Sequence, residues 1–423
     1  MSNKNLISDN AEFIDEVCEM NQEESIEMSN DNYFVSEEEI KEGQQEEAFD
    51  KSKLINLVKR AEKNPKIKLM LIDMIKKIYP EEYLNRITHL LENLNDDNNV
   101  KILNGILQLP TKIKFSINEN LGYEMPPTLK EIIDIIEGMF IAIKKSGIKE
   151  LKDFFDNRGE ILDWLKENTP SFLLVGPPGC GKTNFGIAIA EIFGLRCELI
   201  PCSSTDYLAL SGLSQHWGNA TYGRIAEGLI RANTFPIVYI FDEIDKTGNS
   251  NDYKTIDAIN HIIDPIKPFQ DSFLGVSLYH LLICPIILTA NDISLIPDYV
   301  ISRCKVIEVD ELDPKLIINI AYSNFTKNFK QLTQIYTKDI DEFKNSAKLR
   351  KILSRLVAIK NFDIRAVKKE LKYIFWKFLK FYENNRKNSN KDMFDSLLEL
   401  IEKEIEKMRK QSKKTYGKKI GFV

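Results

Sequence analysis

Residues 171–183 read SFLLVGPPGCGKT, a short apolar segment followed by a glycine-rich loop. The loop, GPPGCGKT at 176–183, matches the pattern GxxxxGK[ST], which is typical of phosphate binding. The apolar segment before the loop predicts a buried strand, and TNFGIAIAEIFG at 183–194 predicts an amphipathic helix after it. The motif requires this order of strand, loop and helix. These residues therefore predict an α/β fold that binds a nucleotide.

Each residue type in the loop has a chemical reason to be there. Glycines allow backbone conformations that point successive N–H groups at a phosphate at the start of a helix. Lys182 is expected to reach the β- and γ-phosphates, and Thr183 is expected to offer its hydroxyl to Mg²⁺. The Cys180 side chain occupies a variable position of the motif and is assigned no chemistry. The whole loop is assigned to ATP binding: Gly176, Pro177, Pro178, Gly179, Cys180, Gly181, Lys182 and Thr183.

Short apolar segments alternate with helical patterns on both sides of the loop. Strands are expected at 172–175, 197–200, 237–241, 284–289 and 306–309. Helices are expected between them, near 182–193, 223–233, 253–263 and 294–302. Such alternation indicates a parallel five-stranded sheet covered by helices.

Polar residues follow two of the expected strands. The segment 237–245 reads IVYIFDEID, so Asp242 and Glu243 come directly after an apolar strand. In a parallel sheet this end faces the nucleotide, so Asp242 is assigned to the Mg²⁺ shell and Glu243 to activation of the attacking water. The alternative is an acidic turn. Asn291 ends the next strand and is expected to bind the γ-phosphate or the water, with a turn or helix cap as its alternative.

Arg303 lies twelve residues beyond Asn291, just before the last expected strand. An exposed arginine here is able to act on the γ-phosphate of a neighbouring subunit.

Composition divides the chain into five regions. Residues 1–50 hold sixteen Asp or Glu against two Lys, a local charge of −14 within a total of −5. Such a segment is expected to be a disordered acidic tail. The regions that we predict are listed in order: the acidic tail 1–50, a helical N-terminal region 51–125, an α/β ATPase domain with a helical lead-in 126–312, an all-α lid 313–405 and a basic tail 406–423.

The remaining composition excludes several classes of protein. A chain of 423 residues with 43% hydrophobic residues is able to build a sizeable core, so a wholly disordered chain is excluded. No apolar run is long enough for a membrane helix, and the first residues do not resemble a secretion signal. The six cysteines are scattered, which indicates reduced thiols and a cytoplasmic protein without a zinc site.

The ordered series of motifs resembles an AAA+ ATPase, and more narrowly the ATPase module of Lon proteases. The likeness covers roughly residues 130–385. Beyond the motifs already named, it extends through five segments: HWGNATYGRIAEGL at 216–229, DEIDKTG at 242–248, FLGVSLYHL at 273–281, LTAND at 288–292 and IPDYVISRCKVIEV at 296–309.

The resemblance implies roles for the matching residues. Lys182 and Thr183 would be Walker A, with Asp242 and Glu243 as Walker B. Asn291 would be sensor 1 and Arg303 the arginine finger. The resemblance also implies ATP and Mg²⁺ as cofactors and a ring, most often a hexamer.

Two further residues take roles only from the resemblance. Arg365 falls where the family has a sensor 2 arginine that contacts ATP; its alternative is a solvated charge. Trp217 falls where the family has an aromatic pore loop that grips a polypeptide; its alternative is packing against the helix at 223–233.

One departure from the family concerns its peptidase. Lon proteases carry a peptidase domain after the ATPase module, whereas only about 40 residues follow the expected lid here. We therefore expect a remodeller or unfoldase without its own peptidase and without a membrane partner. The alternatives are a motor or loader that works on nucleic acid, supported by the Lys-rich residues 407–419, and a scaffold that binds ATP but turns over slowly.

Overall fold

The fold comes from a computed structural model of the chain. The structure describes these residues: 55, 57, 58, 61, 65–116, 127–156, 164, 165, 167–214, 217–247, 255–264, 268–311, 313–336, 347–360, 363–385 and 393–418. The expected acidic tail 1–50 lies outside them.

The described residues form two compact units that meet in sequence at Asp310 and Glu311. The part up to Asp310 is called the core unit, and the part from Glu311 to Lys418 is called the helical unit. The expected boundary between ATPase domain and lid, at 312/313, lies within three residues of this division.

The core unit is built on a parallel five-stranded sheet in the order β2-β3-β6-β1-β7. The bounds of these strands are β1 Ser171–Val175, β2 Cys197–Pro201, β3 Val238–Asp242, β6 Ile286–Ala290 and β7 Cys304–Glu308. The predicted α/β fold with five parallel strands is confirmed. Strand β6 is buried along its whole length and β3 along all but its last residue, as expected for central parallel strands covered on both faces.

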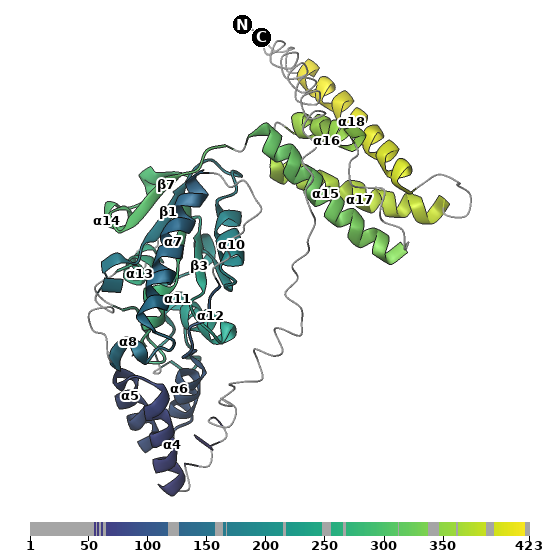
Figure 1. The fold of residues 1–423 in the computed structure, drawn as a ribbon. Coiled ribbons are helices and arrows are strands. Elements are labelled where there is room, and N and C mark those ends of the chain that lie inside the picture. The colour runs from purple at the N-terminus through teal and green to yellow at the C-terminus, as the bar shows by residue number, and fades with distance from the viewer. Residues whose placement is uncertain are drawn as a thin grey trace. The chain divides into compact units, whose positions relative to one another are not determined.

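Helices surround this sheet (Figure 1). The helices of this part of the core unit are α7 Pro127–Ser146, α8 Asp153–Asp156, α10 Lys182–Ile192, α11 Tyr207–Ser211, α12 Arg224–Ala232, α13 Thr255–Ile262 and α14 Asp298–Ile301. Four short 3₁₀ turns join them: Cys202–Ser204, Ile244–Lys246, Tyr279–Ile283 and Ile293–Leu295. Helix α10 packs against β2, β3 and β6, and it therefore fixes the glycine-rich loop over the centre of the sheet.

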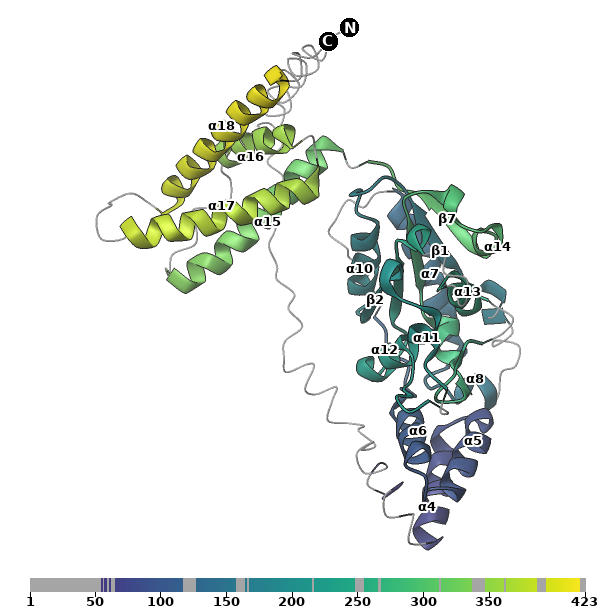
Figure 2. The ribbon, with the colours of Figure 1, turned by 180° about the vertical axis from the view of Figure 1, so that it is seen from behind.

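The helices before residue 125 share the hydrophobic core of the sheet. Helices α4 Pro65–Ile78, α5 Glu81–Glu92 and α6 Asp97–Gln108 stack at one end of the core unit in both views (Figures 1 and 2). Their buried residues belong to the same apolar cluster as the strands. The sequence analysis treats 51–125 as a separate region because amphipathic periodicity does not reveal which partner a helix packs against.

Polar contacts join these helices to the loops of the sheet domain. The Tyr83 hydroxyl donates to Ser277 O at 2.6 Å, and His280 Nε2 lies 2.7 Å from Pro110 O. A Cβ at Gly105 would lie 2.6 Å from a methyl carbon of Leu274, so α6 approaches that loop as closely as only glycine allows.

The helical unit contains four helices around a second, separate apolar cluster. They are α15 Pro314–Tyr336, α16 Ala347–Ile359, α17 Ile364–Asn385 and α18 Met393–Lys418. The expected lid is thus helical, but its predicted end at 405/406 falls inside α18. Among the described residues, no helix is both long enough and apolar enough to cross a membrane.

The loop that carries Trp217 is held at its base by a buried carboxylate. Asp271 begins a short hairpin of two strands, β4 Gln270–Asp271 and β5 Val276–Ser277. Its Oδ2 accepts the N–H of Gly223 at 2.8 Å, and its Oδ1 accepts the N–H groups of Phe273 and Leu274 at 3.0 and 2.8 Å. One side chain therefore fastens the hairpin to the residue on which the Trp217 loop ends.

Burial raises the pKa of the Asp271 carboxyl from 3.8 to about 6, against the three N–H donors, which lower it. The folded chain therefore holds this proton more tightly than the unfolded chain between pH 4 and 6. The resulting stabilisation is present below about pH 4 and is lost as the pH rises through 6.

We predict that the free energy of unfolding decreases by about 3 kcal/mol from this group between pH 4 and 7. Asp271→Asn should remove this decrease because an amide does not ionise. Urea unfolding at several pH values measures the effect, with Asp134→Asn on the exposed side of α7 as the matched control. A variant with the same pH profile as the wild type would contradict the prediction.

Candidate functional site

The glycine-rich loop has the backbone geometry that a phosphate cradle needs. Gly179 and Gly181 have φ values of 91° and 98°, which other residues rarely adopt. A Cβ at Gly176 would lie 2.1 Å from Val309 O, so the loop runs against the end of β7 with no room for a side chain. Gly181 immediately precedes α10, so the N–H groups at the start of that helix open toward the loop.

Lys182 lies at the centre of this loop with its side chain buried. Its Nζ donates to Gly176 O at 2.6 Å, Pro177 O at 2.9 Å and Asn291 Oδ1 at 3.0 Å. The ammonium group therefore lies inside the loop and reaches the end of β6 at the same time.

A single carboxylate oxygen joins three neighbouring segments. Asp242 Oδ1, at the end of β3, accepts the hydroxyl of Thr183 at 2.7 Å and the hydroxyl of Thr289 at 2.7 Å. The Thr289 hydroxyl in turn accepts the N–H of Glu243 at 3.0 Å. The carboxyl ends of β3 and β6 and the first turn of α10 therefore meet at one point.

Two more acidic residues complete this edge of the sheet. Glu243 has φ 57° and ψ 53°, a left-handed conformation that is strained for a residue with a side chain and that recurs at functional sites. Its carboxylate pairs with Lys246 at 2.7 Å. Asp245 Oδ2 accepts the N–H groups of Asn291 and Asp292 at 3.0 and 3.3 Å, and so positions Asn291.

The donor set fits a magnesium–nucleotide complex. Mg²⁺ prefers oxygen ligands and is commonly held by one carboxylate, a hydroxyl and the phosphates themselves. The Thr183 hydroxyl and the Asp242 carboxylate supply two such oxygens within 2.7 Å of each other. No group of three or more His, Cys, Asp or Glu residues gathers around a point in the described part of the chain, and this kind of site needs none.

Arg303 lies away from this cluster. Its neighbour Cys304 pairs with Ser171, the first residue of β1, whereas the glycine-rich loop follows the last residue of β1. A five-residue strand separates these two ends by roughly 13 Å. The guanidinium pairs with Asp264 at 3.2 Å and donates to the Asn260 side chain at the end of α13. Arg303 is therefore unable to serve the site of its own chain.

Trp217 also lies away from the cluster, on an exposed turn. Its side chain is 67% exposed, so the alternative of packing against the helix at 223–233 is wrong. The N–H of Leu213 donates to Thr221 O at 3.0 Å and the N–H of Ala220 donates to Trp217 O at 3.0 Å, which closes the two legs of the loop.

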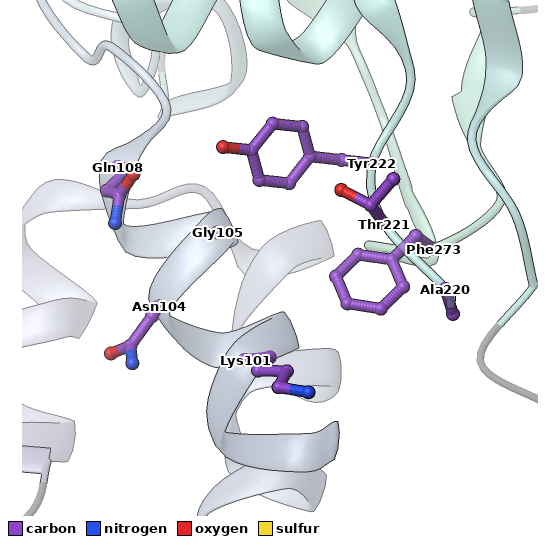
Figure 3. Close-up of a pocket in the computed structure, with 8 residues that line it drawn as sticks. All are labelled: Lys101, Asn104, Gly105, Gln108, Ala220, Thr221, Tyr222 and Phe273. Atoms are coloured by element: carbon purple, nitrogen blue, oxygen red, sulfur yellow. The ribbon is translucent and has the colours of Figure 1, made fainter. Parts of the chain in front are cut away.

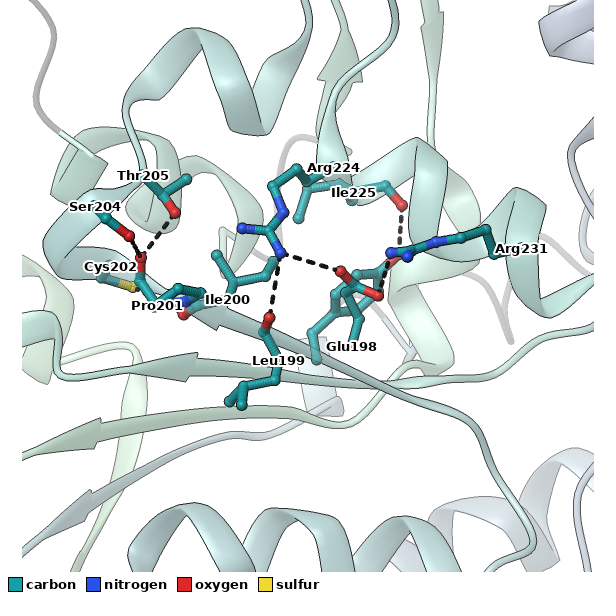
Figure 4. A network of polar contacts seen from close by, with 11 residues as sticks. Glu198, Leu199, Ile200, Pro201, Cys202, Ser204, Thr205, Arg224, Ile225 and Arg231 are labelled. Atoms are coloured by element: carbon teal, nitrogen blue, oxygen red, sulfur yellow. Dashed lines mark hydrogen bonds and ion pairs between the residues drawn. The ribbon is translucent and has the colours of Figure 1, made fainter.

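The far leg of the Trp217 loop leads into α12, which is bound to the edge strand β2. Glu198 pairs with Arg231 at 2.6 Å and with Arg224 at 3.5 Å, and Arg224 also donates to Leu199 O at 3.4 Å (Figure 4). The loop is therefore anchored to a strand whose other neighbour is β3, which ends in Asp242.

A small pocket lies on the other side of this leg. Its volume is about 250 Å³, and it lies between α6 and the residues that follow Trp217. The rings of Tyr222 and Phe273 face Gly105 of α6, with Lys101 one turn away (Figure 3). The N-terminal helices therefore border both the Trp217 loop and the hairpin held by Asp271.

Arg365 belongs to the helical unit. It is exposed in the first turn of α17, where its N–H donates to Asp363 Oδ1 at 2.8 Å. Its expected contact with ATP stays a prediction.

Three functional residues were missed by the sequence analysis. Thr289 lies within an apolar strand, and Asp245 is one acid among several in its segment. Asp271 had a local signal, since an Asp followed by Ser and Phe is able to accept N–H bonds from the next residues. No local signal indicates that its other oxygen reaches Gly223.

Comparisons with known proteins agree with this geometry. Residues 172–311 match the ATPase family associated with various cellular activities (AAA). The chain is 30% identical over 206 residues to a Lon protease of Methanosarcina barkeri, covering 48% of this chain and 24% of that protein. It is 28% identical over 308 residues to a Lon protease of Campylobacter concisus, covering 70% of this chain and 36% of that protein.

A third relative, Lon protease 2 of Thermus thermophilus, is 33% identical over 178 residues, which cover 41% of this chain and 22% of that protein. The chain thus spans about a quarter to a third of the length of these relatives. The glycine-rich loop, the parallel sheet and the matches over 172–311 lead to one conclusion: the chain is an AAA+ protein, and its ATPase module resembles that of Lon proteases.

Proposed function

We propose that the chain binds and hydrolyses Mg²⁺–ATP at the edge of the sheet where β3 and β6 end. The observation that carries this proposal is the bond of 2.7 Å between the Thr183 hydroxyl and Asp242 Oδ1, beside the buried ammonium of Lys182. A hydroxyl, a carboxylate and a lysine in a loop of N–H donors match the needs of a triphosphate and its cation.

The residues of the cluster divide the chemistry of phosphoryl transfer. Lys182 offsets negative charge on the phosphates, and its present bonds to loop carbonyls hold it in place until they are exchanged for phosphate oxygens. Glu243 accepts the proton of the attacking water, and Asn291 orients that water or the γ-phosphate. Magnesium, when bound, supplies positive charge that further offsets the charge of the phosphate oxygens. Positioning and electrostatics do most of the work in such a reaction.

The active species is proposed to be a ring of identical subunits, a hexamer in the simplest case. Arg303 supports this because it lies at the opposite edge of the sheet from its own loop. The neighbour's nucleotide is the one it is able to reach. Arg365 is proposed to contact ATP from the helical unit.

The proposed substrate is a polypeptide that passes the Trp217 loops of the ring. A 67% exposed indole on a closed turn offers a flat, rigid surface to a passing chain. Movement at the site reaches this loop through β3, β2 and α12, since Arg224 and Arg231 bind α12 to Glu198. The function supported best is therefore that of a protein remodeller or unfoldase.

Arg303→Ala should abolish ATP turnover while nucleotide binding persists, because the finger acts in a neighbouring site. Glu243→Gln should also abolish turnover. Mixing the two variants should restore part of the activity, because an Arg303→Ala subunit keeps its Glu243 and receives Arg303 from its partner. Phosphate release at several mixing ratios measures this rescue.

Lys305→Ala is the matched control for Arg303→Ala, since Lys305 lies two residues away and pairs with Glu131 on the surface. It should keep wild-type turnover. If rings shown to contain both variants have no activity at any ratio, the proposed action in trans is wrong.

Trp217→Ala should keep basal ATP hydrolysis within a few-fold of the wild type and lose its stimulation by an unfolded polypeptide. The exposed side chain contributes little packing, so the free energy of unfolding should change by less than about 0.5 kcal/mol. ATPase assays with and without an unfolded protein, together with thermal unfolding, measure both effects.

Leu208→Ala, another exposed apolar side chain near the same helices, is the control. It should keep the stimulation. A Trp217→Ala variant that is still stimulated to the wild-type level would exclude the gripping role.

A further inference from the structure

Helix α17 has an exposed face that the helical unit does not use for packing. Its buried residues form one stripe: Ile364, Val367, Leu371, Ile374, Phe375 and Phe378. The opposite stripe consists of exposed residues: Lys368, Lys369, Lys372, Tyr373, Trp376 and Lys380. We call these six residues the α17 face. At 1.5 Å per residue they extend over about 18 Å of one side of the helix (Figure 1).

The α17 face presents two large aromatic rings to solvent. Tyr373 is 54% exposed and Trp376 is 63% exposed. They are three residues apart, so both rings project from the same side of the helix. Exposed aromatic pairs are informative because folding leaves such rings at the surface with no gain from burial.

Positive charge surrounds these rings. Residues 311–423 contain 27 Lys and Arg against 14 Asp and Glu, a net charge of +13, within a chain whose total is −5. The nearby acids are already paired. Glu370 binds Lys360 at 2.8 Å, and Glu404 binds Lys377 and Lys407 at 2.7 and 2.8 Å. The lysines of the α17 face make no ion pair with any residue that the structure describes.

We propose that the α17 face binds single-stranded nucleic acid. Lysines along a groove or stripe neutralise successive phosphates, and exposed aromatic rings stack on bases without sequence preference. Bases inside a duplex are already stacked and are unable to reach Tyr373 or Trp376, so a single strand fits this face better than a duplex. An acidic polypeptide would use the lysines but would leave the aromatic rings without a partner.

The proposal is independent of the ATP site. Arg365 lies on the same side of α17 but is assigned to nucleotide binding, so it stays unchanged in every variant of the test. The surface lies wholly within the helical unit, and its failure would leave the proposed hydrolysis of ATP untouched.

The test is fluorescence anisotropy of a labelled 20-nucleotide oligothymidylate titrated with the full chain at several salt concentrations. Tyr373→Ala/Trp376→Ala should weaken binding by about tenfold or more with an unchanged salt slope. Lys369→Ala/Lys372→Ala should reduce the salt slope by about 1.4, since each phosphate contact on a single strand contributes about 0.7. Lys76→Ala/Lys77→Ala on α4 removes two exposed lysines elsewhere and should change neither quantity.

Thermal unfolding checks that each variant is folded. Trp376→Leu is a second aromatic variant that keeps an apolar side chain and removes only the stacking surface, and it should also weaken binding.

Several results would overturn the proposal. The first is absence of oligonucleotide binding by the wild type at 50 mM salt. The second is equal loss of binding in the Lys76/Lys77 control. The third is a duplex that binds as tightly as the single strand while the aromatic variants bind normally. Poly-glutamate that competes as well as the oligonucleotide at equal charge would identify an acidic polypeptide as the partner instead.

Discussion

The structure depends on one constraint, the convergence of polar groups at the carboxyl edge of an otherwise apolar sheet. Asp242 Oδ1 accepts hydroxyl groups from Thr183 and Thr289 at the same time, and so connects α10, β3 and β6. The strands behind these residues are buried, so a carboxylate at their end is exposed only on the side of the loop. Removal of one partner would leave a charged oxygen incompletely paired, which is costly in such surroundings.

The same constraint explains how chemistry at this edge is coupled to distant elements. Asp242 ends β3, whose neighbour β2 is bound to α12 through Glu198, Arg224 and Arg231. Helix α12 begins where the Trp217 loop ends, and Asp271 fastens that point to the β4–β5 hairpin. The N-terminal helices contact the hairpin through Tyr83. A change at the phosphate site therefore has a continuous packed route to the Trp217 loop.

Much of this architecture could be predicted from the sequence, and the reasons are local. The five strands were predicted to within two residues at each end because buried parallel strands are continuous apolar runs, as in Ile286–Ala290. Lys182, Thr183, Asp242 and Asn291 were predicted because each follows a recognisable run, and the structure places their side chains within hydrogen-bond reach of one another or of a shared neighbour. Contacts between distant segments were not predictable. The bond of Asp271 to Gly223 and the packing of α4–α6 on the sheet domain depend on tertiary structure, which no short pattern encodes.

The central claim is that the loop at 176–183 and Asp242 bind Mg²⁺ and ATP together. Thermal unfolding of the full chain with a slowly hydrolysed ATP analogue tests it most directly, with and without a chelator of Mg²⁺. Ligand at about 100 times its Kd should stabilise the folded chain by about 2.7 kcal/mol. The account predicts a rise in Tm that requires Mg²⁺ and that disappears in Lys182→Ala. An equal rise in the presence of the chelator, or in the Lys182→Ala variant, would contradict it.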